Sequence, residues 1–91
     1  MAWAPDPLFL YLPAVLPKEP AQRLQIRLAA GLRRERSRQG WTQERAAELA
    51  GLNRRYYQKL EGGTVNVTLR TLERLCRAYG VNVGRLFRRP T

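Results

Sequence analysis

Apolar residues recur at helical spacing in the middle of the chain, and this repeat predicts the first helix. Leu24, Leu28 and Leu32 stand four residues apart. Residues at this spacing share one face of a helix, and an apolar face of this kind packs against a core. We therefore expect a helix over about residues 22–38, ending before Gly40.

Two further helices are predicted on either side of a single glycine. Thr42 is a favourable N-cap for a helix over about residues 43–50, and Asn53 caps another over about residues 54–61. Between them, Gly51 supplies the left-handed turn that joins two helices at a steep angle. The inner face of the first of these helices is made only of small residues, which are Ala46, Ala47 and Ala50.

The last third of the chain predicts two more helices. Thr68 is a suitable N-cap for a helix over about residues 69–79, and Gly80 ends it. A short final helix then carries Leu86 and Phe87. The apolar side of the longer helix is expected to comprise Leu69, Leu72, Cys76 and Tyr79, with Leu75 flanking them. The fold class expected from these patterns is all-α, with five short helices.

The first twenty residues differ in kind from the rest. They hold five of the six prolines, so we expect residues 1–20 to be a Pro-rich, non-helical extension and residues 21–91 to be the folded domain. The extension has neither a membrane-length apolar run nor the basic start of a signal peptide, so no membrane partner is expected. Residues 8–16 are strongly apolar and need a surface on this domain, on a second copy or on a partner protein. We expect the extension to contribute to a dimer interface; a leader without function is the alternative.

The charge balance favours a polyanionic partner. The 91 residues carry 17 Lys+Arg and 7 Asp+Glu, a net charge of +10, and 16 of the basic but only 5 of the acidic residues lie in residues 21–91. This favours nucleic acid first and an anionic membrane surface second. With no His and one Cys, an ordinary zinc site, an internal disulfide and a His-dependent catalytic triad are excluded, and no cofactor or metal is expected.

Residues 42–63 combine these features into a helix-turn-helix, which presents its second helix to the major groove of DNA. The sequence resembles the phage-repressor-like, Xre-type helix-turn-helix family from about residue 28 to residue 87. The matching positions are Gly40-Trp41-Thr42-Gln43, Ala47, Gly51-Leu52, Leu60-Glu61-Gly62, Leu69, and Leu72 through Leu75. Residues 54–69 also resemble the restriction–modification controller proteins, through Arg54, Tyr56, Leu60-Glu61-Gly62 and Asn66-Val67-Thr68-Leu69.

The resemblance implies a set of DNA-binding residues. Gln43 matches the residue that opens the second helix and holds a phosphate, and a helix N-terminus independently attracts anions. The positions that read base edges are taken by Arg54, Arg55 and Lys59, beside Tyr56 on the groove side and Gln58 on the same helix face. Thr64 and Asn66 match the loop that reaches the sugar-phosphate backbone. Arg36 and Glu61 match a structural ion pair between the first and third helices.

The chain departs from the family pattern at three positions. Tyr57 stands where the family usually has Ile or Val, and Glu35 stands where many relatives are apolar. Arg55 replaces the Thr of the controllers, so no known operator sequence carries over. Elsewhere, we expect Trp41 to join the second helix to the first, and the arginines of residues 33–38 to form a solvated face or to lie near phosphates.

The function expected is a sequence-specific, double-stranded DNA-binding regulator of transcription. It would act as a homodimer on a palindromic operator in the cytoplasm of a bacterium or phage, as a repressor, antitoxin or controller. The alternative is an antitoxin-like interaction module whose residues 8–16 dock on a partner protein. An enzyme is the least favoured reading, because the acidic residues show no pairing suited to catalysis or metal binding, and we assign no catalytic residue.

Overall fold

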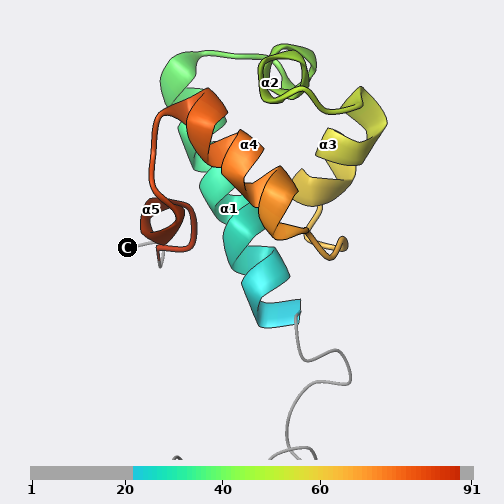
Figure 1. Cartoon of the computed structure of the whole chain (residues 1–91), viewed down its shortest axis with the longest axis vertical. Coiled ribbons are helices and arrows are strands. Elements are labelled where there is room, and N and C mark those ends of the chain that lie inside the picture. Colours follow the sequence, from blue (N-terminus) through green and yellow to red (C-terminus); the bar gives the residue numbers. More distant parts are fainter. Residues whose placement is uncertain (1–21, 89–91) are drawn as a thin grey trace, which may run out of the picture.

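A computed structural model describes residues 22–88 of the chain. These residues form five helices and no strand, so the expected all-α class is confirmed for them (Figure 1). The helices are α1 (Gln22–Gln39), α2 (Gln43–Ala50), α3 (Arg54–Glu61), α4 (Leu69–Tyr79) and α5 (Val83–Leu86). The predictions for residues 1–20, including the division of the chain at residue 20 and any role of residues 8–16, lie outside the described residues.

Local cap chemistry sets the helix boundaries. The side chains of Thr42, Asn53 and Thr68 each accept a hydrogen bond from a backbone N–H of the helix that follows. These bonds satisfy N–H groups of the first turn that have no partner within the helix. Gly51 ends α2 with φ 68° and Gly80 ends α4 with φ 67°, a left-handed conformation that glycine adopts without a steric penalty. These five caps are those expected from the sequence.

The core lies between α1, the helix-turn-helix pair α2–α3, and α4, with α5 closing one end. Its largest fully buried side chains are Tyr57, Leu28, Leu32, Leu60, Leu75, Leu86 and Glu35. The core admits the aromatic ring of Tyr57 because its hydroxyl hydrogen-bonds to the hydroxyl of Tyr79 on α4. Trp41 stacks on Tyr79 with ring centroids 5.3 Å apart.

Leu24, Leu69 and Trp41 pack differently from what their sequence positions indicate, and the expected burial of Leu24 is wrong. Leu24 is 53% exposed, because the first turns of α1 extend past the other helices, as Figure 1 shows at its blue end. Leu69, expected on the apolar side of α4, is 83% exposed, whereas Leu75 and Tyr79 are buried and Leu72 and Cys76 pack partly buried against the core. The backbone of Trp41, just before α2, is hydrogen-bonded to Arg36 of α1, while its ring packs on α4 by stacking on Tyr79.

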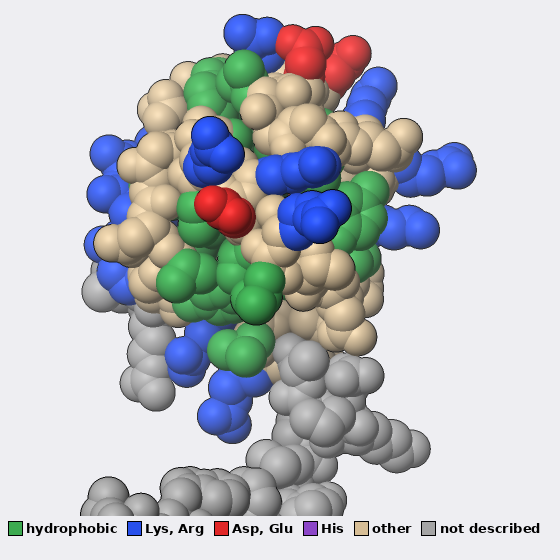
Figure 2. All heavy atoms as spheres, in the orientation of Figure 1, with side chains coloured by type: hydrophobic (Ala, Val, Ile, Leu, Met, Phe, Trp, Pro, Cys, Tyr) green, Lys and Arg blue, Asp and Glu red, His purple; other side chains and the backbone are tan. Residues whose placement is uncertain are grey.

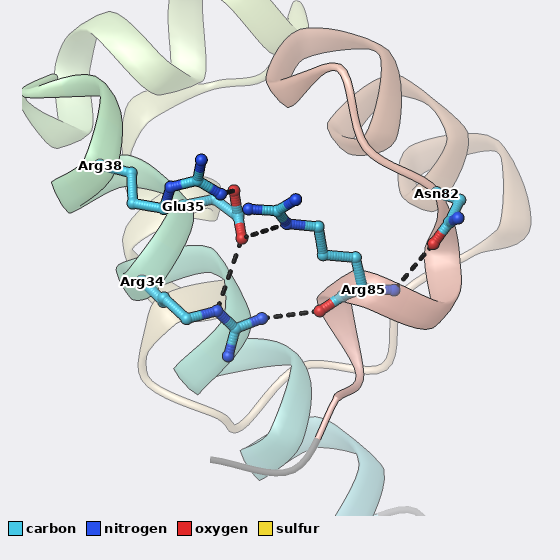
Figure 3. Close-up of polar contacts among 5 residues, drawn as sticks. All are labelled: Arg34, Glu35, Arg38, Asn82 and Arg85. Carbon is cyan, nitrogen blue, oxygen red and sulfur yellow. Dashed lines mark hydrogen bonds and ion pairs between the residues drawn. The ribbon is translucent and has the colours of Figure 1, made fainter. Parts of the chain in front are cut away.

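The buried carboxylate of Glu35 joins α1 to α5 (Figure 3). Its oxygens lie 3.0 Å from Arg85 Nε, 3.4 Å from Arg34 Nε and 3.4 Å from Arg38 Nη1. Arg34 also donates to the carbonyl oxygen of Arg85. Glu35 is tolerated at a position that is often apolar because three guanidinium groups surround it, so Arg34 and Arg38 are not simply a solvated face.

The backbones of α1 and α5 touch at Gly31. A Cβ placed on Gly31 would lie 1.9 Å from the carbonyl oxygen of Leu86, which no side chain at that position can accommodate without a shift. Glycine at this point therefore allows α5 to lie directly on α1 and to bury Leu86.

Candidate nucleic-acid interface

The α2–turn–α3 unit presents one face of α3 to solvent. Arg54, Arg55, Gln58 and Lys59 are exposed, whereas Tyr57 and Leu60 on the opposite side are buried. Figure 2 shows basic side chains projecting from the edge of the molecule at which Figure 1 places α3. The predicted segregation of the two faces of this helix is thus present in the structure.

The cationic side chains of α3 are not packed onto the protein. Arg54 Nη1 lies 3.9 Å from Glu44 Oε2 of α2, but both side chains are largely exposed, and such a surface pair contributes little. Tyr56 differs from its neighbours, because it is half-buried and packs against the core. Arg54, Arg55, Gln58 and Lys59 therefore form the accessible face of α3, with Tyr56 at its edge.

Glu61, at the end of α3, is the centre of a buried polar network. Arg36 of α1 binds it with both ends of its guanidinium group, Nε to Oε2 at 2.7 Å and Nη2 to Oε1 at 3.0 Å. Gln43, at the start of α2, donates to Oε1 at 3.0 Å, and Arg33 donates to the Glu61 carbonyl oxygen. The predicted ion pair between Arg36 and Glu61 is confirmed, and it fixes α3 on α1.

The electrostatics of this network keep Glu61 ionised. Burial alone would raise the pKa of Glu61, but the hydrogen bonds that it accepts, with that of Arg36 the strongest, outweigh burial and lower the pKa below its usual value. Burial also raises the pKa of Tyr57, and it raises that of Tyr79 to about 12, so both hydroxyls stay neutral. A fixed charge pair thus anchors the base of the helix that carries the exposed cations.

The remaining predicted residues lie at the two ends of the helix-turn-helix. Gln43 is half-buried, and its side-chain amide is engaged by Glu61. Thr64 and Asn66 are exposed on the loop between α3 and α4, and Asn66 Oδ1 accepts a hydrogen bond from Gln25 of α1 at 2.7 Å. Sequence reasoning missed these two tethers, because each joins residues at least 18 positions apart with no local motif.

Other kinds of site find little support in the described part of the chain. Among residues 22–88, no three His, Cys, Asp or Glu side chains are grouped so that they could hold a metal ion. In the same residues no helix is long and apolar enough to cross a bilayer. Cys76 is half-buried on α4, and burial raises the pKa of its thiol.

The fold and this exposed cationic helix define a DNA-binding protein of the helix-turn-helix class. Residues 27–88 match the model of the helix-turn-helix domain family, and the chain belongs to that family. It is 38% identical over 81 residues to a Neisseria hypothetical transcription factor from Neisseria meningitidis serogroup B, covering 89% of this chain and 74% of that protein.

Two further comparisons agree. The chain is 37% identical over 55 residues to the HTH-type transcriptional regulator PuuR of Escherichia coli, covering 60% of this chain but only 30% of the regulator. The crystal structure of the hypothetical transcription factor NHTF from Neisseria superposes with a TM-score of 0.70 at 34% identity, covering 74% of this chain and 77% of that one. The chain is accordingly a DNA-binding regulator of transcription.

Proposed function

We propose that the chain binds a palindromic or near-palindromic operator in double-stranded DNA as a homodimer, with α3 of each copy in the major groove. The observation that carries this proposal is the two-sided character of α3: its cations are exposed, while Tyr57 and Leu60 bury the other side. A helix seated this way offers its polar face to a ligand without any rearrangement of the core.

Each side chain on the exposed face has a chemically suitable partner in DNA. Arg54 or Arg55 would bind the guanine edge with both ends of a guanidinium group, a contact worth about 1–3 kcal/mol of discrimination. Gln58 suits adenine in the same way, and Lys59 suits guanine or a phosphate. Tyr56, at the border of this face, would lie against the groove wall.

Phosphate contacts are proposed at both ends of the unit. Gln43 opens α2, where backbone N–H groups and the helix dipole favour an anion, while its side chain is held by Glu61. Thr64 and Asn66 are exposed on the loop after α3. Such contacts position the protein on the duplex rather than reading its sequence, and they make binding weaken as salt rises.

An apolar surface on α4 and α5 supports the homodimer. Leu69, Leu72, Cys76 and Val83 line an open hollow of about 300 Å³ together with Glu73. Figure 2 shows apolar side chains gathered on this face, below a group of charged ones. A two-fold axis through such a surface would bury it against itself. To bind two adjacent half-sites, the dimer must hold the two α3 helices about one DNA turn, roughly 34 Å, apart.

This mode of action needs no catalytic step and no cofactor. We propose that the protein regulates by occupying its operator, as a repressor or controller-type autoregulator where the operator overlaps a promoter. The compartment implied by a DNA ligand and by these bacterial relatives is the bacterial cytoplasm.

Selection of bound duplexes from a random DNA pool tests the proposal. We expect a symmetric consensus with half-sites about 10 base pairs apart, from centre to centre. Replacing Arg54 and Arg55 together with alanine should abolish enrichment, whereas Arg77→Ala, at an exposed position of α4, should leave the consensus unchanged. Unchanged operator binding by the double variant would refute the groove assignment and favour an interaction module. An asymmetric consensus would refute the dimer.

A further inference from the structure

An apolar groove lies beside the first turns of α1. Its volume is about 160 Å³, and its lining residues are Leu24, Gln25, Leu28, Val65, Asn66, Val67 and Phe87. A cavity of about 150 Å³ with apolar walls accepts a benzene-sized molecule, so this groove has room for an aliphatic side chain of leucine size. It is separate from the exposed face of α3 and from the apolar surface proposed for the dimer.

The groove is held open by a hydrogen bond between its two walls, yet part of its apolar lining is exposed to solvent. The hydrogen bond from Gln25 to Asn66, 2.7 Å long, fixes the loop against α1. Leu24, by contrast, is 53% exposed within the described residues. An apolar segment that covered this groove and the half-exposed leucine at its rim would remove apolar surface from water. Such burial would stabilise the folded protein.

We propose that residues 8–16 of the same chain dock in this groove. These residues contain two apolar runs of the sequence that precedes α1, Leu8–Leu12 and Ala14–Leu16. The chain enters α1 at Gln22, two residues before Leu24, and therefore arrives at the rim of the groove. The proposed occupant is thus joined to α1 at a point that lies next to the groove.

The connection is long enough for this return. Five residues separate Leu16 from Gln22, and an extended chain of that length reaches up to about 20 Å. Pro17 and Pro20 within it favour a turn rather than continuation of the helix toward the N-terminus. Leu16 can therefore reach the groove, whose rim includes Leu24.

The tether favours the chain's own segment over that of a second copy. A short tether gives an effective concentration in the millimolar range, so even a weak apolar contact within one chain is populated at low protein concentration. This inference does not depend on DNA binding.

Methyl nuclear Overhauser effects (NOEs) in the full-length protein test the docking. We expect cross-peaks between the leucine methyls of residues 8–16 and those of Val65 and Val67. A half-filtered spectrum of a mixture of labelled and unlabelled chains should lack these cross-peaks. If these cross-peaks are absent from the ordinary spectrum, the proposal is wrong. If they are present in the half-filtered spectrum, the occupant of the groove is the segment of a second copy. If they appear only when a partner protein is added, docking depends on that partner, which also overturns the proposal.

Matched variants give an independent measurement by thermal unfolding. Leu10→Ser with Leu12→Ser, on the segment, and Leu24→Ser, on the groove, should each lower the melting temperature by about 4–8 °C. Leu49→Ser is the control, because this leucine is 41% exposed on α2, away from the groove. The segment and groove variants combined should lose no more than either alone. Additive losses, or no loss beyond the control, contradict the proposal.

Discussion

Replacing Arg36 with methionine tests the view that a buried ion pair fixes the DNA-binding helix in place. Methionine keeps the unbranched apolar stem and removes the charge, so Glu61 loses the two hydrogen bonds of 2.7 and 3.0 Å that Arg36 donates. The Glu61 side chain is 3% exposed and that of Arg36 is 23% exposed. The change therefore leaves a carboxylate that is buried without its main partner.

Breaking a buried pair by removing one partner costs about 3–5 kcal/mol. We expect the lower end, about 3 kcal/mol, because Gln43 still donates to Glu61 and because Arg36 is partly solvated. For a domain of this size that loss lowers the melting temperature by about 12–24 °C. Urea unfolding at constant pH measures it, with Arg45→Met as the control for an exposed pair, where we expect less than about 1 kcal/mol.

The same loss must depend on pH. In the natural protein the pKa of Glu61 is lowered on folding, so its contribution to stability is present above the unfolded value near 4.5 and is lost as the pH falls below it. In the variant, burial acts without Arg36 and raises the pKa of Glu61, so the variant gains stability as the carboxyl takes up its proton. The difference between the two proteins should therefore shrink as the pH falls from 7 toward 4. A difference that stays constant over this range would refute the electrostatic account and indicate lost packing alone.

Three further predictions concern other elements. Gly31→Ala should destabilise the fold by about 1–3 kcal/mol in urea unfolding, because its Cβ would collide with the Leu86 carbonyl oxygen; an unchanged midpoint would contradict the packing of α5 on α1. Arg55→Ala should weaken operator binding by about 1–3 kcal/mol in fluorescence anisotropy, while calorimetry shows an unchanged melting temperature. If the variant loses the same affinity for the operator as for unrelated duplexes, Arg55 does not read a base. Leu69→Glu should yield a folded monomer in sedimentation equilibrium, because Leu69 is 83% exposed within one chain; a dimer of undiminished stability would place the interface elsewhere.

The helix boundaries could be predicted because their causes are local. A capping oxygen at Thr42, Asn53 or Thr68 acts on N–H groups two or three residues away, and the left-handed turns at Gly51 and Gly80 need only glycine. The two faces of α3 follow from helical spacing in the same way. These features need no knowledge of the rest of the molecule.

The remaining features depend on where helices end in space and on what arrives from far along the chain. Leu24 and Leu69 fit apolar repeats, but each lies near the start of a helix, where the body of the domain covers it incompletely. The partner of Glu35 on α5 is 50 residues away, and Gly31 matters only because α5 returns to it. The spacing of residues along the sequence contains no information about which distant segment will pack against Glu35 or Gly31.

The arrangement around Glu61 separates the parts of the molecule that hold the recognition helix from the parts that would read DNA. Arg36 and Gln43 bind its carboxylate from α1 and α2, while residues 54, 55, 58 and 59 stay exposed. Substitutions at these four positions can change the preferred base sequence without altering the angle at which the helix is offered. A lineage that inherits this framework is therefore free to acquire new target sites by few mutations, each at little risk to folding.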